Sequence, residues 1–162
     1  GVDDGVRVGP LISAGQRDKV QDLVEDAVSA GADVLLGGEP AAGEGYFYPP
    51  TVLTGIPEHA RVRREEIFGP VAPVAAFDTE EEAIAAVNDT EYGLSNYVFT
   101  NDLNRAIRVS EALESGMVGI NLGVVSNPAA PFGGVKESGL GREGGDIGID
   151  EFLETKYIGI AL

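Results

Sequence analysis

The chain has 162 residues, of which 43% are hydrophobic and 23% charged, a balance typical of a soluble globular protein with an apolar core. Its 27 acidic residues outnumber 11 basic ones, which gives a net charge of −16 and makes nucleic acid an unfavourable partner because such a surface repels phosphate. No segment resembles a membrane span or a secretory signal, so we expect a cytoplasmic protein with no membrane partner.

The sequence has no cysteine and a single histidine, His59. Without cysteine there are no disulfides, no thiolate metal ligands and no cysteine nucleophile within the chain. His59 lies in the polar segment PEHARVRREE, with no second metal ligand nearby and no G-x-S-x-G motif to serve. We therefore predict an exposed histidine, no metal site and no serine hydrolase chemistry.

The first half of the chain alternates helical and extended patterns. Ser13 can cap a helix over residues 13–30, whose apolar positions recur at helical spacing and which Gly31 ends. Strands are predicted over residues 33–36 and 51–55, separated by a loop rich in glycine, aromatic residues and proline. Residues 71–77 are strongly apolar and predict a buried strand.

The second half continues the alternation. Thr79 can cap a helix to about residue 88, with Glu82 as capping-box partner. A strand over residues 94–100, a helix that Asp102 caps and that ends near residue 115, and a strand over residues 117–121 follow. This pattern predicts an α/β fold with a mostly parallel sheet flanked by helices.

The last forty or so residues predict a different kind of structure. Residues 122–147 form a long loop rich in glycine, proline and serine, and such loops are uncommon unless they bind something. The tail over residues 151–162 is extended and apolar, and an apolar strand at a sheet edge favours pairing with another chain.

Four segments appear in order along the chain: EEIFGP (65–70), YGLSNYVFT (92–100), PFGGVKESGLGRE (131–143) and KYIGIAL (156–162). Together they resemble the aldehyde dehydrogenase superfamily across almost the whole length. The resemblance implies the last third of a family subunit, with the C-terminal part of the catalytic domain over residues 1–150 and an oligomerisation strand over residues 151–162. It also implies NAD or NADP as cofactor, a small aldehyde as substrate and a homo-oligomer formed through the terminal strand.

Glu66 and Phe68 of the EEIFGP segment are the candidate cofactor residues. A carboxylate can accept hydrogen bonds from two vicinal ribose hydroxyls, and an aromatic ring can pack beside a planar heterocycle. The resemblance implies that Glu66 binds the nicotinamide ribose and that Phe68 packs by the nicotinamide. The alternative is an acidic loop in which Phe68 belongs to the core.

The segment GINLGVVSNP (119–128), followed by APFGG, resembles the succinate-semialdehyde dehydrogenase branch of the family. The resemblance implies that the Ser126 hydroxyl contacts the carboxylate at the far end of the substrate and that Phe132 lines the aldehyde pocket. The alternatives are a loop serine that caps a turn and a core phenylalanine that anchors the Gly-Gly turn.

Glu143 and Arg142 follow in the same segment. The resemblance implies that Glu143 is a secondary proton relay and that Arg142 pairs with Glu154 of the tail. The alternative for both is a solvated charge pair that contributes little.

The family's chemistry implies a cysteine thiolate that attacks the aldehyde, hydride transfer to nicotinamide, and a glutamate that activates water for release of the acid. Because no cysteine is present, we predict that the isolated chain has no dehydrogenase activity. Two alternatives are a natural non-catalytic module that assembles with a full-length subunit, and a dehydrogenase for glutarate semialdehyde or another aldehyde.

Overall fold

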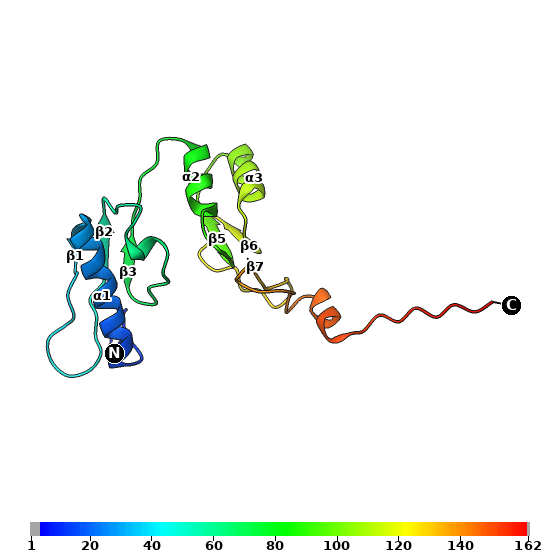
Figure 1. Ribbon diagram of the computed structural model, residues 1–162, viewed down its shortest axis with the longest axis horizontal. Helices are drawn as coiled ribbons and strands as arrows, with labels where there is room; N and C mark the ends of the chain where they lie inside the picture. The colour runs from blue at the N-terminus through cyan, green and yellow to red at the C-terminus, as the bar shows by residue number, and fades with distance from the viewer. Residues whose placement is uncertain (1–3, 162) are drawn as a thin grey trace. The chain divides into compact units, whose positions relative to one another are not determined.

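The computed structural model describes residues 4–161, and the chain divides into two compact units, the first ending at Ala76 and the second beginning at Phe77 (Figure 1). The first unit contains helix α1 (Ala14–Ala30), strands β1 (Asp33–Leu36), β2 (Thr51–Thr54) and β3 (Val71–Pro73), and the 3-10 helix η1 (Arg61–Arg63). The second contains α2 (Glu80–Asn88), β4 (Tyr92–Gly93), β5 (Ser95–Val98), α3 (Leu103–Ala112), β6 (Met117–Ile120), β7 (Val135–Lys136) and the 3-10 helix η2 (Ile147–Phe152). The expected domain boundary at residue 150 stays a prediction.

Both ends of α1 are formed as the sequence predicts. The Ser13 hydroxyl accepts a hydrogen bond from the N–H of Gln16 at 3.2 Å. At the other end Gly31 takes the left-handed conformation, with φ 117°, and its N–H donates to the carbonyl of Val28 at 3.0 Å. A residue without a Cβ adopts this conformation at little cost, which is why the helix ends there.

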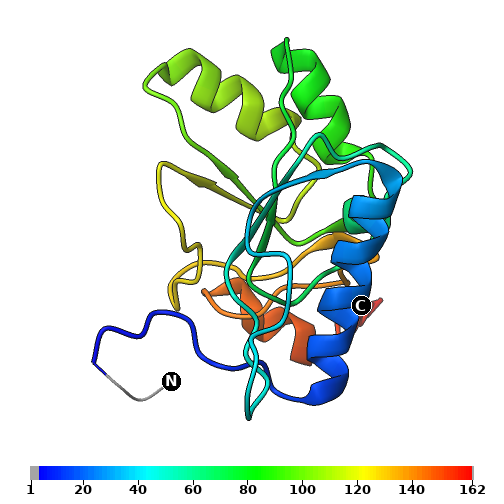
Figure 2. The ribbon, with the colours of Figure 1, turned by 90° about the vertical axis from the view of Figure 1, so that its left-hand side faces the viewer.

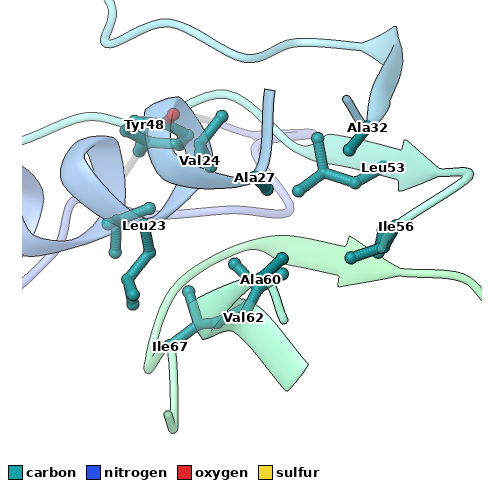
Figure 3. Close-up of a cluster of buried hydrophobic side chains, with 11 residues drawn as sticks. Leu23, Val24, Ala27, Ala32, Tyr48, Leu53, Ile56, Ala60, Val62 and Ile67 are labelled. Atoms are coloured by element: carbon teal, nitrogen blue, oxygen red, sulfur yellow. The ribbon is translucent and has the colours of Figure 1, made fainter. Parts of the chain in front are cut away.

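The core of the first unit lies between α1, the strand β2 and the segment around η1 (Figure 3). Strand β2 is the middle of a three-stranded sheet, antiparallel to β1 and parallel to β3. Helix α1 buries the face that recurs at helical spacing. The buried cluster comprises Val20, Leu23, Val24, Ala27, Ala32, Tyr48, Leu53, Ile56, Ala60, Val62 and Ile67.

The prediction of a buried strand over residues 71–77 was wrong in length and in burial. The strand ends at Pro73, and the N–H of Val74 makes the last hydrogen bond to β2, to the carbonyl of Leu53 at 2.9 Å. The partner strand β2 ends at Thr54, where Gly55 turns the chain with φ 60°, and Val74 and Phe77 are exposed. The apolar composition of this segment therefore did not indicate a core strand.

The second unit has two small sheets, with β5 parallel to β6 and β4 antiparallel to β7. Among the strands of the described residues, two of the four pairings are antiparallel, so the prediction of a mostly parallel sheet was wrong. Parallel pairing needs a crossover, which α3 provides between β5 and β6, whereas no helix separates β1 from β2. The fold is α/β with small mixed sheets.

Helices α2 and α3 lie side by side in both views (Figures 1 and 2). The carboxylate of Glu80 joins them, because it accepts hydrogen bonds from Arg108 at 2.5 Å and from Arg105 at 3.2 Å. The predicted caps are confirmed: the Thr79 hydroxyl accepts from the N–H of Glu82 at 3.1 Å, and the Asp102 carboxylate begins α3. Helix α3 ends at Ala112, before the predicted residue 115.

The long loop and the tail both depart from expectation. Residues 122–147 include β7 and an antiparallel bridge between Phe132 and Glu143, so this loop is partly ordered by pairing. Residues 153–161 form no strand in the described chain, and their side chains are exposed, with Tyr157 92% exposed. The described residues also hold no helix long and apolar enough to cross a membrane.

Candidate functional site

The EEIFGP loop of the first unit is fixed to α1 through its backbone. The side-chain amide of Gln16 donates to the carbonyls of Ile67 and Phe68, each at 3.0 Å. The ammonium of Lys19 donates to the carbonyl of Glu66 at 2.7 Å. Three consecutive carbonyls thus accept hydrogen bonds from one face of one helix.

The same loop also packs against the core and against α1. Ile67 is buried in the core. Gly69 lies directly against α1, where a Cβ atom would come within 2.6 Å of Cγ2 of Val20. Because real Cβ atoms do not approach other carbons so closely, only glycine fits at this position with the loop and helix as they are.

Phe68 has a backbone conformation that non-glycine residues rarely adopt, with φ 52°. Such a left-handed conformation costs about 1–2 kcal/mol for an L-residue, so surrounding contacts must offset it. The residue is 70% exposed. The alternative in which Phe68 is a core residue is therefore wrong, and an exposed aromatic ring on a fixed backbone is suited to contact a ligand.

The two neighbouring glutamates of the loop differ in what they contact. Arg61 donates to the Glu65 carboxylate at 2.6 Å and to Asp22 at 2.7 Å. The hydrogen bond from Arg61 to Glu65 lowers the pKa of Glu65. Glu66 is exposed, and within residues 4–161 only its carbonyl oxygen is hydrogen-bonded. Of the two carboxylates, that of Glu66 is therefore the one without a hydrogen-bond partner within residues 4–161.

The second unit places two of the other candidates together. Phe132 and Glu143 form the antiparallel bridge, with the N–H of each donating to the carbonyl of the other at 2.7 and 2.8 Å. Both line a hollow of about 360 Å³, together with residues from the Gly-Gly turn and η2. Phe132 is half-buried and Glu143 is exposed, and both residues border this hollow.

Arg142 connects the segments that line this hollow. Its guanidinium donates to the carbonyls of Gly134 and Gly141, both at 2.7 Å, and its backbone N–H donates to the carboxylate of Glu151 at 3.1 Å. The expected pair with Glu154 is not formed in this structure, where the carboxylate at Arg142 is that of Glu151. Glu151 lies in η2, which folds back on the loop, whereas Glu154 lies in the exposed tail.

Ser126 lies on the exposed loop that follows β6, outside this hollow. The loop begins at Asn121, with φ 55°, whose side-chain amide accepts from the N–H of Thr100 and donates to its carbonyl, both at 2.9 Å. The turn after Ser126 is capped by Asn127, whose side chain accepts from the N–H of Ala129 at 3.0 Å. The residue that caps this turn is therefore Asn127 and not Ser126.

Other parts of the described chain contribute less to the site. His59 is exposed, as predicted, and the described residues contain no group of histidine and carboxylate side chains that could hold a metal. A larger hollow of about 530 Å³, lined by α2, β5 and α3, contains none of the candidate residues. The motifs gave no indication of Gln16, Lys19 and Asn121, although the helical spacing of the first two beside Val20 was a usable signal.

The comparisons with known proteins agree with these motifs. A model of the aldehyde dehydrogenase family matches residues 1–158, and the chain belongs to this family. It is 56% identical to the succinate-semialdehyde dehydrogenase of Paenarthrobacter nicotinovorans, over 99% of this chain and 36% of that protein. It is 53% identical to the glutarate-semialdehyde dehydrogenase of Pseudomonas aeruginosa, over 98% of this chain and 33% of that protein.

Solved structures are also similar to the chain over nearly its whole length. The crystal structure of an NADP-dependent enzyme from Escherichia coli matches with a TM-score of 0.93 at 50% identity, over 99% of this chain and 33% of that one. An NAD+ complex of an aldehyde dehydrogenase from Bacillus cereus matches with a TM-score of 0.88 at 40% identity, over 94% of this chain and 31% of that one. The chain spans about a third of the length of these relatives.

Proposed function

We propose that this chain supplies the nicotinamide-ribose contact and part of the aldehyde pocket of an NAD(P)-dependent dehydrogenase that oxidises succinate semialdehyde to succinate. The observation that carries the proposal is the loop at residues 65–70, whose backbone α1 fixes while the side chains of Glu66 and Phe68 stay exposed. The identity to a succinate-semialdehyde dehydrogenase supports the choice of substrate. A cytoplasmic location is part of the same proposal.

On the cofactor side, each residue has one role. The Glu66 carboxylate accepts hydrogen bonds from the two ribose hydroxyls, and the Phe68 ring packs by the nicotinamide and excludes water from it. When bound, NAD(P) supplies the acceptor for the hydride that leaves the aldehyde carbon. The carboxylate of Glu66 and the ring of Phe68 fit these groups, because both residues are exposed.

On the substrate side, the roles are assigned to Phe132, Ser126 and Glu143. Phe132 forms an apolar wall of the aldehyde pocket, and the Ser126 hydroxyl donates to the distal carboxylate of the substrate. Glu143 shares the hollow with Phe132 and takes up or releases a proton there. Arg142 fixes the backbone that carries Glu143 and the Gly-Gly turn.

The first experiment concerns activity. The purified 162-residue chain, given succinate semialdehyde with NAD or NADP, is expected to show no turnover, since it has no thiol to attack the aldehyde. Turnover above a heat-killed control would contradict this. A chimera in which the chain replaces the matching third of the Paenarthrobacter relative is expected to oxidise succinate semialdehyde.

The second experiment tests the cofactor residues in that chimera. Loss of a charge-assisted hydrogen bond in Glu66→Gln, or of the ring in Phe68→Ala, is expected to raise the KM for NAD(P) about tenfold. Glu58→Gln is the matched control, because Glu58 is another exposed carboxylate of the first unit. An unchanged KM in both site variants would remove this loop from the cofactor site.

The substrate assignment has a specific rival, because the similarity to a glutarate-semialdehyde dehydrogenase is nearly as high. A panel of succinate semialdehyde, glutarate semialdehyde and a neutral aldehyde, run on the chimera, separates the two. Ser126→Ala is expected to reduce the preference for acidic aldehydes, since the distal carboxylate loses a donor. An unchanged preference would remove Ser126 from the substrate site.

The exposed apolar tail favours a second candidate function, assembly with another subunit. Tyr157, Ile158 and Ile160 are 92%, 72% and 78% exposed, and such a segment can add a strand to a sheet edge of a partner. The same pairing is the proposed route to a homo-oligomer. Co-purification of the chain with a full-length family subunit, lost when the tail is removed at residue 153, would support assembly. A tail-independent complex would contradict it.

A further inference from the structure

The backbone of the EEIFGP loop contains a feature that ordinary extended chain does not have. Successive carbonyls of a strand point in opposite directions. Here the carbonyls of Glu66, Ile67 and Phe68 all accept hydrogen bonds from α1. The backbone must turn to allow this, and the positive φ of Phe68 is where it turns.

We infer that Gln16 and Lys19 are positioning residues that hold Phe68 in its left-handed conformation and thereby set how its ring meets the nicotinamide. For its ligand this inference rests on the proposed function, whereas the geometry stands without it. Gln16 and Lys19 are one helical turn apart on α1, so a single rigid element supplies all three donors. The contacts of both residues are with the backbone of the loop, so both act through Phe68.

The loop has separate anchors that do not depend on these donors. Ile67 remains in the core, and Gly69 remains packed against Val20. Removal of the donors therefore leaves the loop attached to α1 but lets Phe68 relax to the negative φ that L-residues favour. The ring, which projects from that residue, is then presented in a different direction.

The geometry is tested by NMR on the complete 162-residue chain. A positive φ brings the amide proton and Hα of a residue close together, so wild-type Phe68 is expected to show a strong intraresidue cross-peak between them. The double variant Gln16→Glu/Lys19→Met keeps side chains of similar size but removes the donors, and it is expected to weaken this cross-peak. Lys19→Arg, which keeps a cationic donor, is expected to retain it.

Arg17→Gln is the matched control, because Arg17 lies between the two donors on α1 but its guanidinium, within residues 4–161, pairs only with the adjacent Asp18. It is expected to leave the Phe68 cross-peak unchanged. Far-UV circular dichroism confirms that each variant retains its helix content, and the single variants Gln16→Glu and Lys19→Met replace the double variant if that one does not fold. A Phe68 cross-peak that survives removal of the donors overturns the inference.

Binding is tested with nicotinamide mononucleotide, which carries the nicotinamide and ribose but not the adenine half of NAD. The wild-type chain is expected to bind it. The double variant is expected to bind about tenfold more weakly, as loss of an aromatic contact of about 1.4 kcal/mol implies. Equal affinity in the double variant, despite an altered Phe68, overturns the inference. If the wild-type chain binds none while the cross-peak responds as expected, the proposed cofactor role fails and the positioning of Phe68 stands.

Discussion

The contact between Gly69 and Val20 gives the most direct test of how the cofactor loop is held. In Gly69→Ala the new Cβ would lie 2.6 Å from Cγ2 and 3.2 Å from Cγ1 of Val20. Val20 is fully buried, and a β-branched side chain in a helix has one strongly preferred rotamer. The clash therefore has to be relieved by moving the loop away from α1.

The size of the effect follows from the packing. Adding a methyl group to a closely packed site costs about 1–3 kcal/mol in the free energy of unfolding. Val20→Ala, which deletes two buried methyl groups, costs about 2 kcal/mol by itself. In the double variant Val20→Ala/Gly69→Ala, the new methyl of residue 69 occupies space that residue 20 has vacated, so the two costs do not add. We expect the double variant to be more stable than the sum predicts by about 1–2 kcal/mol.

Urea unfolding of the four proteins of this cycle, followed by far-UV circular dichroism, measures the coupling. The wild-type chain, Gly69→Ala, Val20→Ala and the double variant are compared under identical conditions. Additive costs, or a Gly69→Ala variant as stable as wild type, would show that the loop does not lie against α1 as described. The same variants also report on the loop that carries Phe68, since a displaced loop alters its backbone.

Three further predictions concern other parts of the chain. Burial raises the pKa of Tyr48 to about 12 from its ordinary 10.0, so its contribution to stability is complete below pH 10 and is lost as the pH rises toward 12; Tyr48→Phe should remove this loss in unfolding experiments. The hydrogen bond from the N–H of Arg105 lowers the pKa of Asp102 below 3.8, so helix content at α3 should fall as the pH drops below this value, whereas Asp102→Asn should keep its helix content in acid-titration circular dichroism. Asn121→Gly keeps the positive φ but loses both hydrogen bonds to Thr100, so amide exchange at residue 100 should quicken about tenfold; slow exchange in this variant would contradict the clamp.

Local signals predicted the helices well. The caps at Ser13, Thr79 and Asp102 form the expected hydrogen bonds, because an N-cap needs only contacts within three residues of the chain. Glu82 departs in a detail, since its carboxylate accepts from the N–H of Asp78 rather than of the capping residue. Strand pairing was predicted less well, because its direction depends on residues far apart in sequence.

For the candidate site, too, local motifs indicated the residues but not their conformation. Motifs identified Glu66, Phe68, Phe132 and Glu143, and the structure places the last two on one bridge and at one hollow. No pattern indicated that Phe68 would have a positive φ. That conformation depends on donors far away along the chain, since Gln16 and Phe68 are 52 residues apart.

The sequence by itself determined the family, the residues that cap the helix N-termini and which residue types are available for chemistry, because these depend on local hydrogen bonds and on motifs in order. Only the tertiary structure decided which glutamate of the EEIFGP loop is engaged by an arginine, which carboxylate meets Arg142, and which strands pair antiparallel. Those outcomes depend on contacts between segments distant in sequence, where small differences in packing and hydrogen-bond geometry select one partner over its neighbour.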